Sequence, residues 1–226
     1  TADNVDGVDD GAPGAGAFAG LIVSPIVNLA PGAEVSNETF PGGQQDDASD
    51  ANGNMTVDFG FVPNMSIGST VFYDRNDDGT QSGVLEVGIS GVQVQLLYDA
   101  NGDGAITDAE LSPVATLTTD AVGNYYFGNL PKGNYQVIIP TPDASAETSS
   151  TGQNTTDNTD GVDDGAQSGS GNAVSSPIVN LTPGAESVNG GAETAQGNTQ
   201  DDAADSNGNM TVDFGFIPNG SIGSSV

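Results

Sequence analysis

The sequence contains no cysteine and no histidine, and its only basic residues are Arg75 and Lys132. These absences exclude disulfides, thiol nucleophiles and imidazole bases. Against the two basic residues stand 31 acidic ones, which give a net charge of −29. Such a charge repels nucleic acids and anionic membranes and favours cations as partners. We therefore expect a protein that is not an enzyme and has no nucleic-acid partner.

Long hydrophobic runs are also lacking, so we expect no membrane insertion in this segment. The hydrophobic fraction is nevertheless 35%, and the apolar residues fall in short alternating runs between clusters of Gly, Asp and Asn. Alternation with a period of two is typical of strands with one buried face. Helical periodicity is nearly absent, with one short candidate at 107–111. The sequence therefore predicts an all-β protein, an antiparallel Ig-like β-sandwich.

The expected strands lie between residues 66 and 220. Proline cannot donate to a strand ladder, so Pro177 should confine its strand to a sheet edge. The last strand places four large apolar side chains on one face. The expected strands are 67–73, 92–96, 114–118, 125–127, 135–139, 174–181 and 210–216.

The chain also repeats itself. The segments that return are DNVDGVDDGA at residue 3 (DNTDGVDDGA at 157), SPIVNL at 24 (again at 176) and GNMTVDFGF at 53 (again at 208). A period near 155 residues, read from Gly53 to Gly208, has the size of a domain and not of a solenoid turn. The sequence therefore predicts tandem domains: the C-terminal part of one repeat at 1–65, a complete repeat at 66–220, and the first strand of the next at 221–226.

The clearest local motif is DANGDGAITDAE at 99–110, which fits the calcium-loop pattern D-x-[DN]-x-[DN]-G-x5-E. Ca²⁺ takes six to eight oxygen ligands, and this spacing supplies short polar side chains at alternate positions as the chain curls round the ion. Gly104 permits the sharp turn. The loop follows an expected strand, so no helix–loop–helix is predicted; a solvated acidic turn is the alternative. The expected ligands are Asp99, Asn101, Asp103, the carbonyl of Ala105, and Glu110.

A second motif directly follows the first expected strand. Its twelfth position holds Leu85, and the acidic residue comes one position late, so one insertion must be accommodated in the loop. The expected ligands are Asp74, Asn76, Asp78, the carbonyl of Thr80, and Glu86.

Two further acidic clusters occur in both copies of the repeat. Carboxylates packed this closely repel one another, which favours a bound cation. Hydrated acidic turns are the alternative, and an Asp-rich, Lys-poor composition also suits a halophile or serves solubility. The candidate metal ligands are Asp157, Asp160, Asp163 and Asp164 in one cluster and Asp201, Asp202, Asp205 and Asn207 in the other.

A longer stretch carries a family resemblance: SIGSTVFYDRNDDGTQSG from residue 66, GISGVQVQLLYDANGDG from 88 and TLTTDAVGNYYFGNLPKGNYQVIIP from 116. It resembles the B domain of serine–aspartate repeat (Sdr) surface adhesins, within the collagen-adhesin B-type (Cna B-like) group. The resemblance implies a calcium-binding β-sandwich in tandem array, forming a stalk that projects a ligand-binding head. Some collagen-adhesin relatives carry a Lys–Asn isopeptide bond; Lys132, the only lysine, sits in an expected hairpin turn, so no such bond is expected.

The leading hypothesis is a calcium-stabilised repeat module of an extracellular fibre or cell-surface adhesin stalk. Its expected partners are neighbouring repeats of the same chain, with identical chains in a fibre as a further candidate. A short connector containing Pro218 favours a semi-rigid rod. The alternatives are a ligand-binding adhesin module that recognises a protein or glycan, and a polyacidic mineral-binding protein.

Overall fold

The structure is a computed structural model that describes residues 9–34, 51–142, 146–149, 160–167, 172–186 and 206–218. The chain divides into two compact units, Thr1–Val62 and Pro63–Val226, called unit 1 and unit 2 below. The boundary falls three residues before the expected one at 65/66. The expected start of a further repeat, 221–226, lies outside the described residues.

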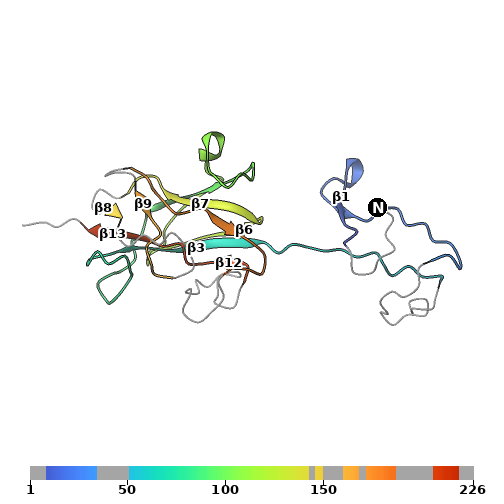
Figure 1. The fold of residues 1–226 in the computed structure, drawn as a ribbon, viewed down its shortest axis with the longest axis horizontal. Helices are drawn as coiled ribbons and strands as arrows, with labels where there is room; N and C mark the ends of the chain where they lie inside the picture. Colours follow the sequence, from blue (N-terminus) through green and yellow to red (C-terminus); the bar gives the residue numbers. More distant parts are fainter. Residues whose placement is uncertain are drawn as a thin grey trace, which may run out of the picture. The chain divides into compact units, whose positions relative to one another are not determined.

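Unit 2 contains one sheet built around its first strand. The order of neighbours is β12, β3, β13, β8, and β6 also pairs with β3 (Figure 1). The strands of this sheet are β3 (Met65–Tyr73), β6 (Asn124–Leu130), β8 (Ala146–Ser149), β12 (Gly208–Asn209) and β13 (Phe214–Pro218).

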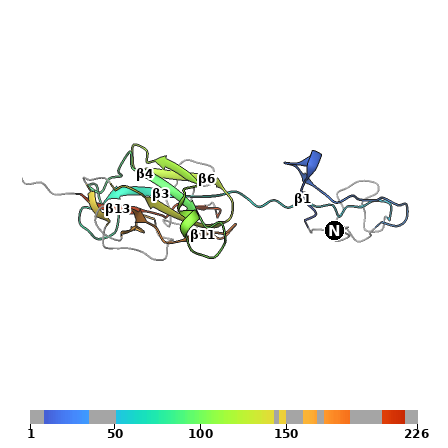
Figure 2. The same cartoon turned by 90° about the horizontal axis from the view of Figure 1, so that it is seen from above.

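The other sheet of unit 2 is built around β7 (Gly133–Ile139). The order of neighbours is β5, β4, β7, β10, β9, and β11 also pairs with β7. Figure 2 shows β4 and β11 of this sheet. Its remaining strands are β4 (Gln93–Tyr98), β5 (Ala115–Thr118), β9 (Ala166–Gln167), β10 (Val174–Ser175) and β11 (Val179–Leu181). The all-β sandwich expected from the sequence is confirmed.

Two expected strands are shorter than predicted. The segment 174–181 is divided into β10 and β11, and Pro177 lies in the gap between them. Ser176 fills that gap in the ladder: its N–H donates to the carbonyl of Val137, and its hydroxyl accepts the N–H of Val137. The segment 210–216 is a regular strand only from Phe214 onward. The helical candidate at 107–111 is confirmed as a short 3₁₀ helix, η2 (Asp108–Leu111).

The first and last strands of unit 2 lie side by side and run in the same direction. Val71 is opposite Phe214 and Tyr73 is opposite Phe216 in a parallel pair, and β12 also pairs with β3 in parallel. These two parallel pairs are exceptions within the antiparallel sandwich that the sequence predicts. Parallel strands need a long connection, and nearly the whole unit separates β3 from β13 in sequence. The chain therefore enters the sandwich at one end and leaves it at the opposite end.

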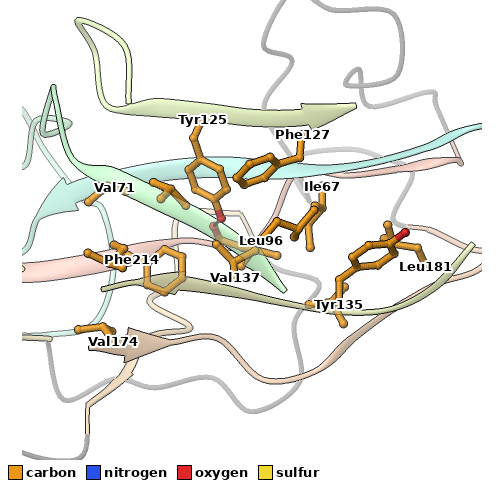
Figure 3. Close-up of a cluster of buried hydrophobic side chains, with 14 of the residues drawn as sticks. Ile67, Val71, Leu96, Tyr125, Phe127, Tyr135, Val137, Val174, Leu181 and Phe214 are labelled. Carbon is orange, nitrogen blue, oxygen red and sulfur yellow. Dashed lines mark hydrogen bonds between the residues drawn. The ribbon is translucent and has the colours of Figure 1, made fainter. Parts of the chain in front are cut away.

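The core of unit 2 lies between the two sheets. Figure 3 shows Val71 and Phe214 from one sheet facing Val137 and Val174 from the other. Tyr125 lies in an edge-to-face arrangement with Phe127, their ring centroids 6.0 Å apart. Apolar burial of this kind is the main favourable term in folding.

Unit 1 contains β1 (Ala12–Pro13), the 3₁₀ helix η1 (Gly16–Phe18) and β2 (Ile22–Val23). The two strands form an antiparallel pair. The repeated motif TVDFGF has an exposed apolar side chain in this unit: Phe61 is 75% exposed, whereas Phe216, at the same place in the repeat, is 2% exposed. The two copies of one motif therefore have different environments.

This contrast predicts different costs for one substitution. Phe216→Ala should lower the free energy of unfolding of unit 2 by about 3–5 kcal/mol, because it leaves a cavity between the sheets. Phe61→Ala should change it by less than about 0.5 kcal/mol, because that ring contributes little burial. Urea unfolding followed by tyrosine fluorescence measures both. Equal losses in the two variants would contradict this account of the core.

Candidate cation-binding loops

The two calcium-type loops follow strands of different sheets. The loop 74–86 begins where β3 ends, and the loop 99–110 begins where β4 ends. The N–H of Asp74 donates to the carbonyl of Phe216, so the first loop lies where the chain leaves unit 2. The N–H of Asp99 donates to the carbonyl of Asn134, just after the β6–β7 turn, and Leu130 at that turn pairs with Met65. The second loop therefore lies at the end where the chain enters (Figure 1).

In the loop 99–110, side-chain oxygens accept hydrogen bonds from the backbone of the loop itself. Asp99 accepts from the N–H of Gly102 at 2.7 Å through Oδ1 and from that of Gly104 at 2.8 Å through Oδ2. Asn101 and Asp103 each accept from the N–H two residues further on, at 2.8 and 2.9 Å. The polar side chains at alternate positions thus curl the backbone around one centre.

Glu110 closes this loop from the other side. Its Oε1 accepts from the N–H of Ala100 at 3.0 Å, and its Oε2 accepts from the N–H of Thr107 at 3.1 Å. The second bond belongs to a capping box at the start of η2, in which the Thr107 side chain in turn accepts from the Glu110 backbone N–H. The short 3₁₀ helix therefore serves to aim the Glu110 carboxylate at the beginning of the loop.

The loop 74–86 repeats this hydrogen-bond scheme. Asp74 accepts from the N–H of Asp77 at 2.7 Å and from that of Gly79 at 2.7 Å. Asn76 and Asp78 each accept from the N–H two residues further on, at 3.1 and 2.9 Å. The two loops therefore have the same internal architecture, although they belong to different sheets.

Glu86 also repeats the role of Glu110, despite its late position. Its Oε1 accepts from the N–H of Arg75 at 3.3 Å, and its Oε2 accepts from the N–H of Ser82 at 2.5 Å. Arg75 and Ser82 are the second and ninth residues of the loop, as Ala100 and Thr107 are in the other. The extra residue is absorbed at Gly83, whose φ of 78° is left-handed. Leu85, at the nominal twelfth position, is 69% exposed.

The sharp turns in both loops use left-handed backbone. Gly79 and Gly104, at the sixth position, have φ of 77° and 83°. The fourth position is left-handed as well, at Asp77 with φ of 58° and at Gly102 with φ of 74°. Asp is one of the few residues besides glycine that tolerates this region. The glycine at the sixth position thus plays the part predicted for it.

The donor chemistry of both loops suits a hard divalent cation. Each loop offers carboxylates, one amide oxygen and a main-chain carbonyl, and no nitrogen or sulfur ligand. Within the described part of the chain, no three acidic side chains are drawn together closely enough to hold a metal ion. The loops therefore have the backbone form and ligand types that calcium requires, with their carboxylates directed to backbone N–H groups.

Of the first acidic cluster, Asp160, Asp163 and Asp164 are described, and Asp157 lies outside the described residues. The Asp163 Oδ1 accepts from the N–H of Gly165 at 2.8 Å and from that of Gly215 at 3.0 Å. The Asp164 Oδ2 accepts from the N–H of Asp213 at 3.0 Å. These two carboxylates are buried and join the turn to the last strand.

The same turn also contacts the first calcium-type loop. The N–H of Asp163 donates to the carbonyl of Gly79 at 2.9 Å, and the N–H of Gln81 donates to the carbonyl of Gly161 at 2.7 Å. Thr80 and Val162 form a bridge between these two bonds. From the sequence we predicted two separate sites, the cluster that contains Asp163 and the loop 74–86. In the structure they lie side by side.

Sequence analysis missed Asp213, which is fully buried beside this turn. Its carboxylate accepts from the Ser69 hydroxyl at 2.7 Å and from the N–H of Gly161 at 2.7 Å. Burial raises the pKa of Asp213 well above its usual range, and Asp160 raises it further, while the hydrogen bonds oppose the shift. The signal was present, because the same residue recurs as Asp58 in the motif TVDFGF.

Of the second acidic cluster only Asn207 is described; Asp201, Asp202 and Asp205 lie outside the described residues. The Asn207 side-chain oxygen accepts from the N–H of Gly184 at 3.1 Å, and its carbonyl accepts from the N–H of Ser66 at 3.1 Å. Asn207 thus ties a turn to the first strand of unit 2.

Comparison with known proteins assigns the fold to a family. The family model described as the SdrD B-like domain matches residues 65–185, more than half of the chain. The chain therefore belongs to this family. Its structure is a mainly antiparallel sandwich with aspartate-rich loops after two of its strands.

Similar proteins come from staphylococci. A fibrinogen-binding protein of Staphylococcus epidermidis is 40% identical over 122 residues, which cover 53% of this chain and 9% of that protein. Serine-aspartate repeat-containing protein C of Staphylococcus aureus (strain Newman) is 38% identical over 133 residues, which cover 53% of this chain and 13% of that protein. The match thus spans about a tenth of each relative.

Family membership makes residues 65–185 an SdrD B-like domain, and the similar proteins support an extracellular, cell-surface location. The comparisons point to surface adhesins and indicate no catalytic family. In the described ranges, no helix has the length and apolar character needed to cross a membrane.

The 99–110 loop generates a prediction about pH. The side-chain amide of Asn134 donates to the Asp99 Oδ2 at 2.9 Å and, with the backbone N–H groups of the loop, lowers the pKa of Asp99. A lowered carboxyl pKa adds stability that is present above the unfolded pKa, about 3.9, and is lost as pH falls through the folded value. Asn134→Ala should raise the pKa of Asp99, so that this loss begins at higher pH.

A carboxyl-carbon NMR titration in calcium-free buffer measures the Asp99 pKa directly. Gln136→Ala is the control, because the side-chain amide of Gln136 donates to the carbonyl of Ser176 at 2.8 Å and, in the described hydrogen bonds, not to Asp99. An unchanged Asp99 pKa in Asn134→Ala, or an equal rise in the control, would show that the Asn134 amide does not hold this carboxylate.

Proposed function

We propose that unit 2 is a calcium-stabilised, load-bearing spacer of an extracellular adhesin stalk. The single observation that carries the proposal is the parallel pairing of β3 with β13. Because the first and last strands are parallel neighbours, the chain enters at one end of the sandwich and leaves at the other. Repeats of this kind, joined through a short connector that contains proline, would extend end to end.

The same pairing resists force along the chain. Tension applied to the two ends of unit 2 pulls β3 and β13 in opposite directions along their length. The ladder that places Val71 opposite Phe214 and Tyr73 opposite Phe216 is then loaded along its whole length at once, and not one pair after another. A ladder sheared in this way is stronger than one that is unzipped, which suits a segment that holds a distant head.

Calcium would act at both ends of this spacer. The loop 74–86 lies beside the exit of the chain, and the loop 99–110 lies near its entry. Bound calcium supplies positive charge and a fixed oxygen geometry, which holds acidic loops together. The residues that would hold it in the two loops are Asp74, Asn76, Asp78, Thr80 and Glu86, and Asp99, Asn101, Asp103, Ala105 and Glu110.

The charge of the chain supports this role. With 31 acidic residues and two basic ones, side-chain ion pairs can neutralise only a small part of the acidic charge. The Arg75 guanidinium donates to the carbonyl of Leu85 at 2.7 Å and lies over the Tyr73 ring, so it braces the loop through these two contacts. Divalent cations are therefore the charge partners that this composition favours, and the extracellular space supplies calcium.

Calcium should raise the melting temperature of unit 2. A site with free calcium at 100 times its dissociation constant adds about 2.7 kcal/mol, which for a domain of this size is a rise of about 5–10 °C. Scanning calorimetry with calcium and with excess chelator measures the difference. An identical melting curve in both conditions would contradict the proposal that calcium stabilises unit 2.

Variants assign the effect to the loops. Glu110→Gln and Glu86→Gln each remove one carboxylate while keeping its size and an acceptor oxygen, so each should reduce the calcium-dependent rise. Asp120→Asn is the matched control, because Asp120 is an exposed carboxylate that accepts backbone N–H groups at a turn outside both loops. A calcium response reduced equally in the control would mean that binding is diffuse and not seated in the loops.

The mechanical role predicts that unfolding force depends on the direction of pulling. The chain has no cysteine, so pairs of introduced cysteines define attachment points. Pro63→Cys with Asn219→Cys loads β3 and β13 in shear, whereas Pro63→Cys with Lys132→Cys unzips β3 from β6, since Met65 is opposite Leu130. Single-molecule force spectroscopy should give a higher unfolding force for the first pair; equal forces would remove the load-bearing argument.

A further inference from the structure

The strand β5 lies at the edge of its sheet. It pairs with β4 on one side, and in the described part of the chain no strand pairs with its other side. The N–H of Thr119 donates to the carbonyl of Val92, at the β4 side. Because successive N–H groups of a strand point to alternate sides, those of Thr116 and Thr118 point away from β4. The outer edge of β5 therefore presents backbone groups with which another strand can pair.

The other edge strands that the structure describes in unit 2 are protected against such pairing. β9 and β12 have two residues each, and the three-residue β11 lies between Pro177 and Pro183. β6 contains Asn129, whose φ of 58° is left-handed, and its register with β3 shifts. β8 contains Glu147, and its register with β13 shifts. Short strands, proline, charge and bulges are the usual devices against edge-to-edge pairing.

β5 has none of these local devices except modest length. Ala115–Thr118 contains no charged residue and no proline, and its register with β4 is regular over all four residues. Thr116 and Thr118 are both exposed. Threonine is among the residues that favour strands. In a chain with 31 acidic residues, β5 thus offers a neutral edge that is suited to strand pairing.

The adjoining strand extends this neutral surface. In β4, Gln95 lies opposite Thr116 and Gln93 lies opposite Thr118. The acidic residue nearest to β5 in sequence is Asp120, and its carboxylate accepts the N–H groups of the turn that follows. The acidic loops 74–86 and 99–110 lie at the two ends of unit 2. Two acidic copies of this chain therefore repel each other less at this flank than at the ends.

We infer that β5 is a lateral association site for a second copy of this chain, paired antiparallel across the outer edge. The strand is self-complementary. When Leu117 lies opposite Leu117 of the second copy, Thr116 lies opposite Thr118 of the second copy, and the reverse pair also forms. Each of these two pairs exchanges both of its N–H···O=C bonds, and threonine pairs across strands are favourable. A two-fold axis relates the copies, so the contact closes at a dimer.

Charge favours this occupant over others. A basic partner would be attracted to the acidic loops and not to a neutral edge, whereas β5 of a second copy is itself neutral, exposed and matched in pattern. The contact buries far less than the about 1,200 Å² of a standard interface, so it is weak between free chains. Stalks held side by side on a cell surface reach effective concentrations in the millimolar range, at which weak pairing can join them. That consequence rests on the proposed stalk role; the pairing itself does not depend on calcium.

Disulfide trapping tests both the partner and the register. The chain has no cysteine, so Thr116→Cys chains can be mixed with isotope-labelled Thr118→Cys chains in a thiol–disulfide exchange buffer. In the inferred register these two positions lie about 5.5 Å apart between copies, a separation that a disulfide spans. Identical positions are offset along the strands beyond the about 7 Å limit. Mass spectrometry should find mixed-chain disulfides well above their statistical share; a statistical distribution would overturn the inference.

Sedimentation equilibrium tests the edge in the chain without cysteine. The parent chain should show a concentration-dependent dimer in calcium buffer and in excess chelator. Thr116→Glu with Thr118→Glu places like charges directly opposite each other and should abolish it. The control is Val84→Glu with Leu85→Glu, which adds the same charge at positions that are 92% and 69% exposed in the loop 74–86, and which should keep the dimer. Melting curves of both variants check that unit 2 is folded.

Three results would overturn the inference. The first is a parent chain that stays monomeric up to about 1 mM, the concentration range that surface tethering supplies. The second is a dimer that the control variant removes and the edge variant does not, which would place the contact at the exit loop. The third is a dimer that requires calcium and survives the edge variant. That dimer would be joined through its acidic loops, and calcium binding by unit 2 would stand while the β5 contact would not.

Discussion

The structure depends on hydrogen bonds from backbone N–H groups to aspartate and glutamate carboxylates. In a chain with two basic residues, side-chain ion pairs cannot hold the acidic loops, and the main chain takes their place. Asp74 and Asp99 each accept from several N–H groups of their own loops, and Asp163 joins a turn to β13 in the same way. Such charge-assisted bonds are stronger than neutral ones, so the acidic residues build the turns as well as carrying the charge.

This structural use of the carboxylates is compatible with the cation binding that we propose for the loops. A carboxylate has two oxygens with about four acceptor sites, so an N–H group occupies only part of its capacity. In the loops 74–86 and 99–110 the backbone bonds fix the direction in which each side chain leaves the chain. A cation that binds such a loop would therefore find oxygens already positioned by backbone hydrogen bonds. The conformational entropy cost of ordering the loop is then part of folding and not of binding.

Most of the strands and both calcium-type loops could be predicted from the sequence, and the features that could not have physical causes. The strands were predicted because their apolar residues alternate with a period of two. The loop 99–110 was predicted because each ligand residue lies at the position that the calcium-loop pattern requires. Glu86 was harder, since a motif counts residues, whereas the carboxylate need only reach the second and ninth N–H groups; Gly83 makes that possible. The parallel pairing of β3 with β13 leaves no local signal at all, because it joins strands separated by almost the whole unit. Asp213 lies in an apolar strand motif, where its burial depends on a turn distant in sequence.

Because one motif occurs twice in this chain, the effect of its own sequence on conformation can be distinguished from the effect of its surroundings on burial. Unit 1 and the second half of unit 2 share turns, register and hydrogen-bond lengths, yet Phe61 and Phe216 differ in exposure from 75% to 2%. The local conformation must therefore be specified within the C-terminal half-repeat, by its Asp, Asn and Glu side chains bonding to nearby backbone. Burial, by contrast, is specified by the other half, through β3, β6 and β7. A domain divided in this way folds its polar framework from short-range contacts and obtains most of its stability only when the two halves meet, because the apolar area removed from water lies between them.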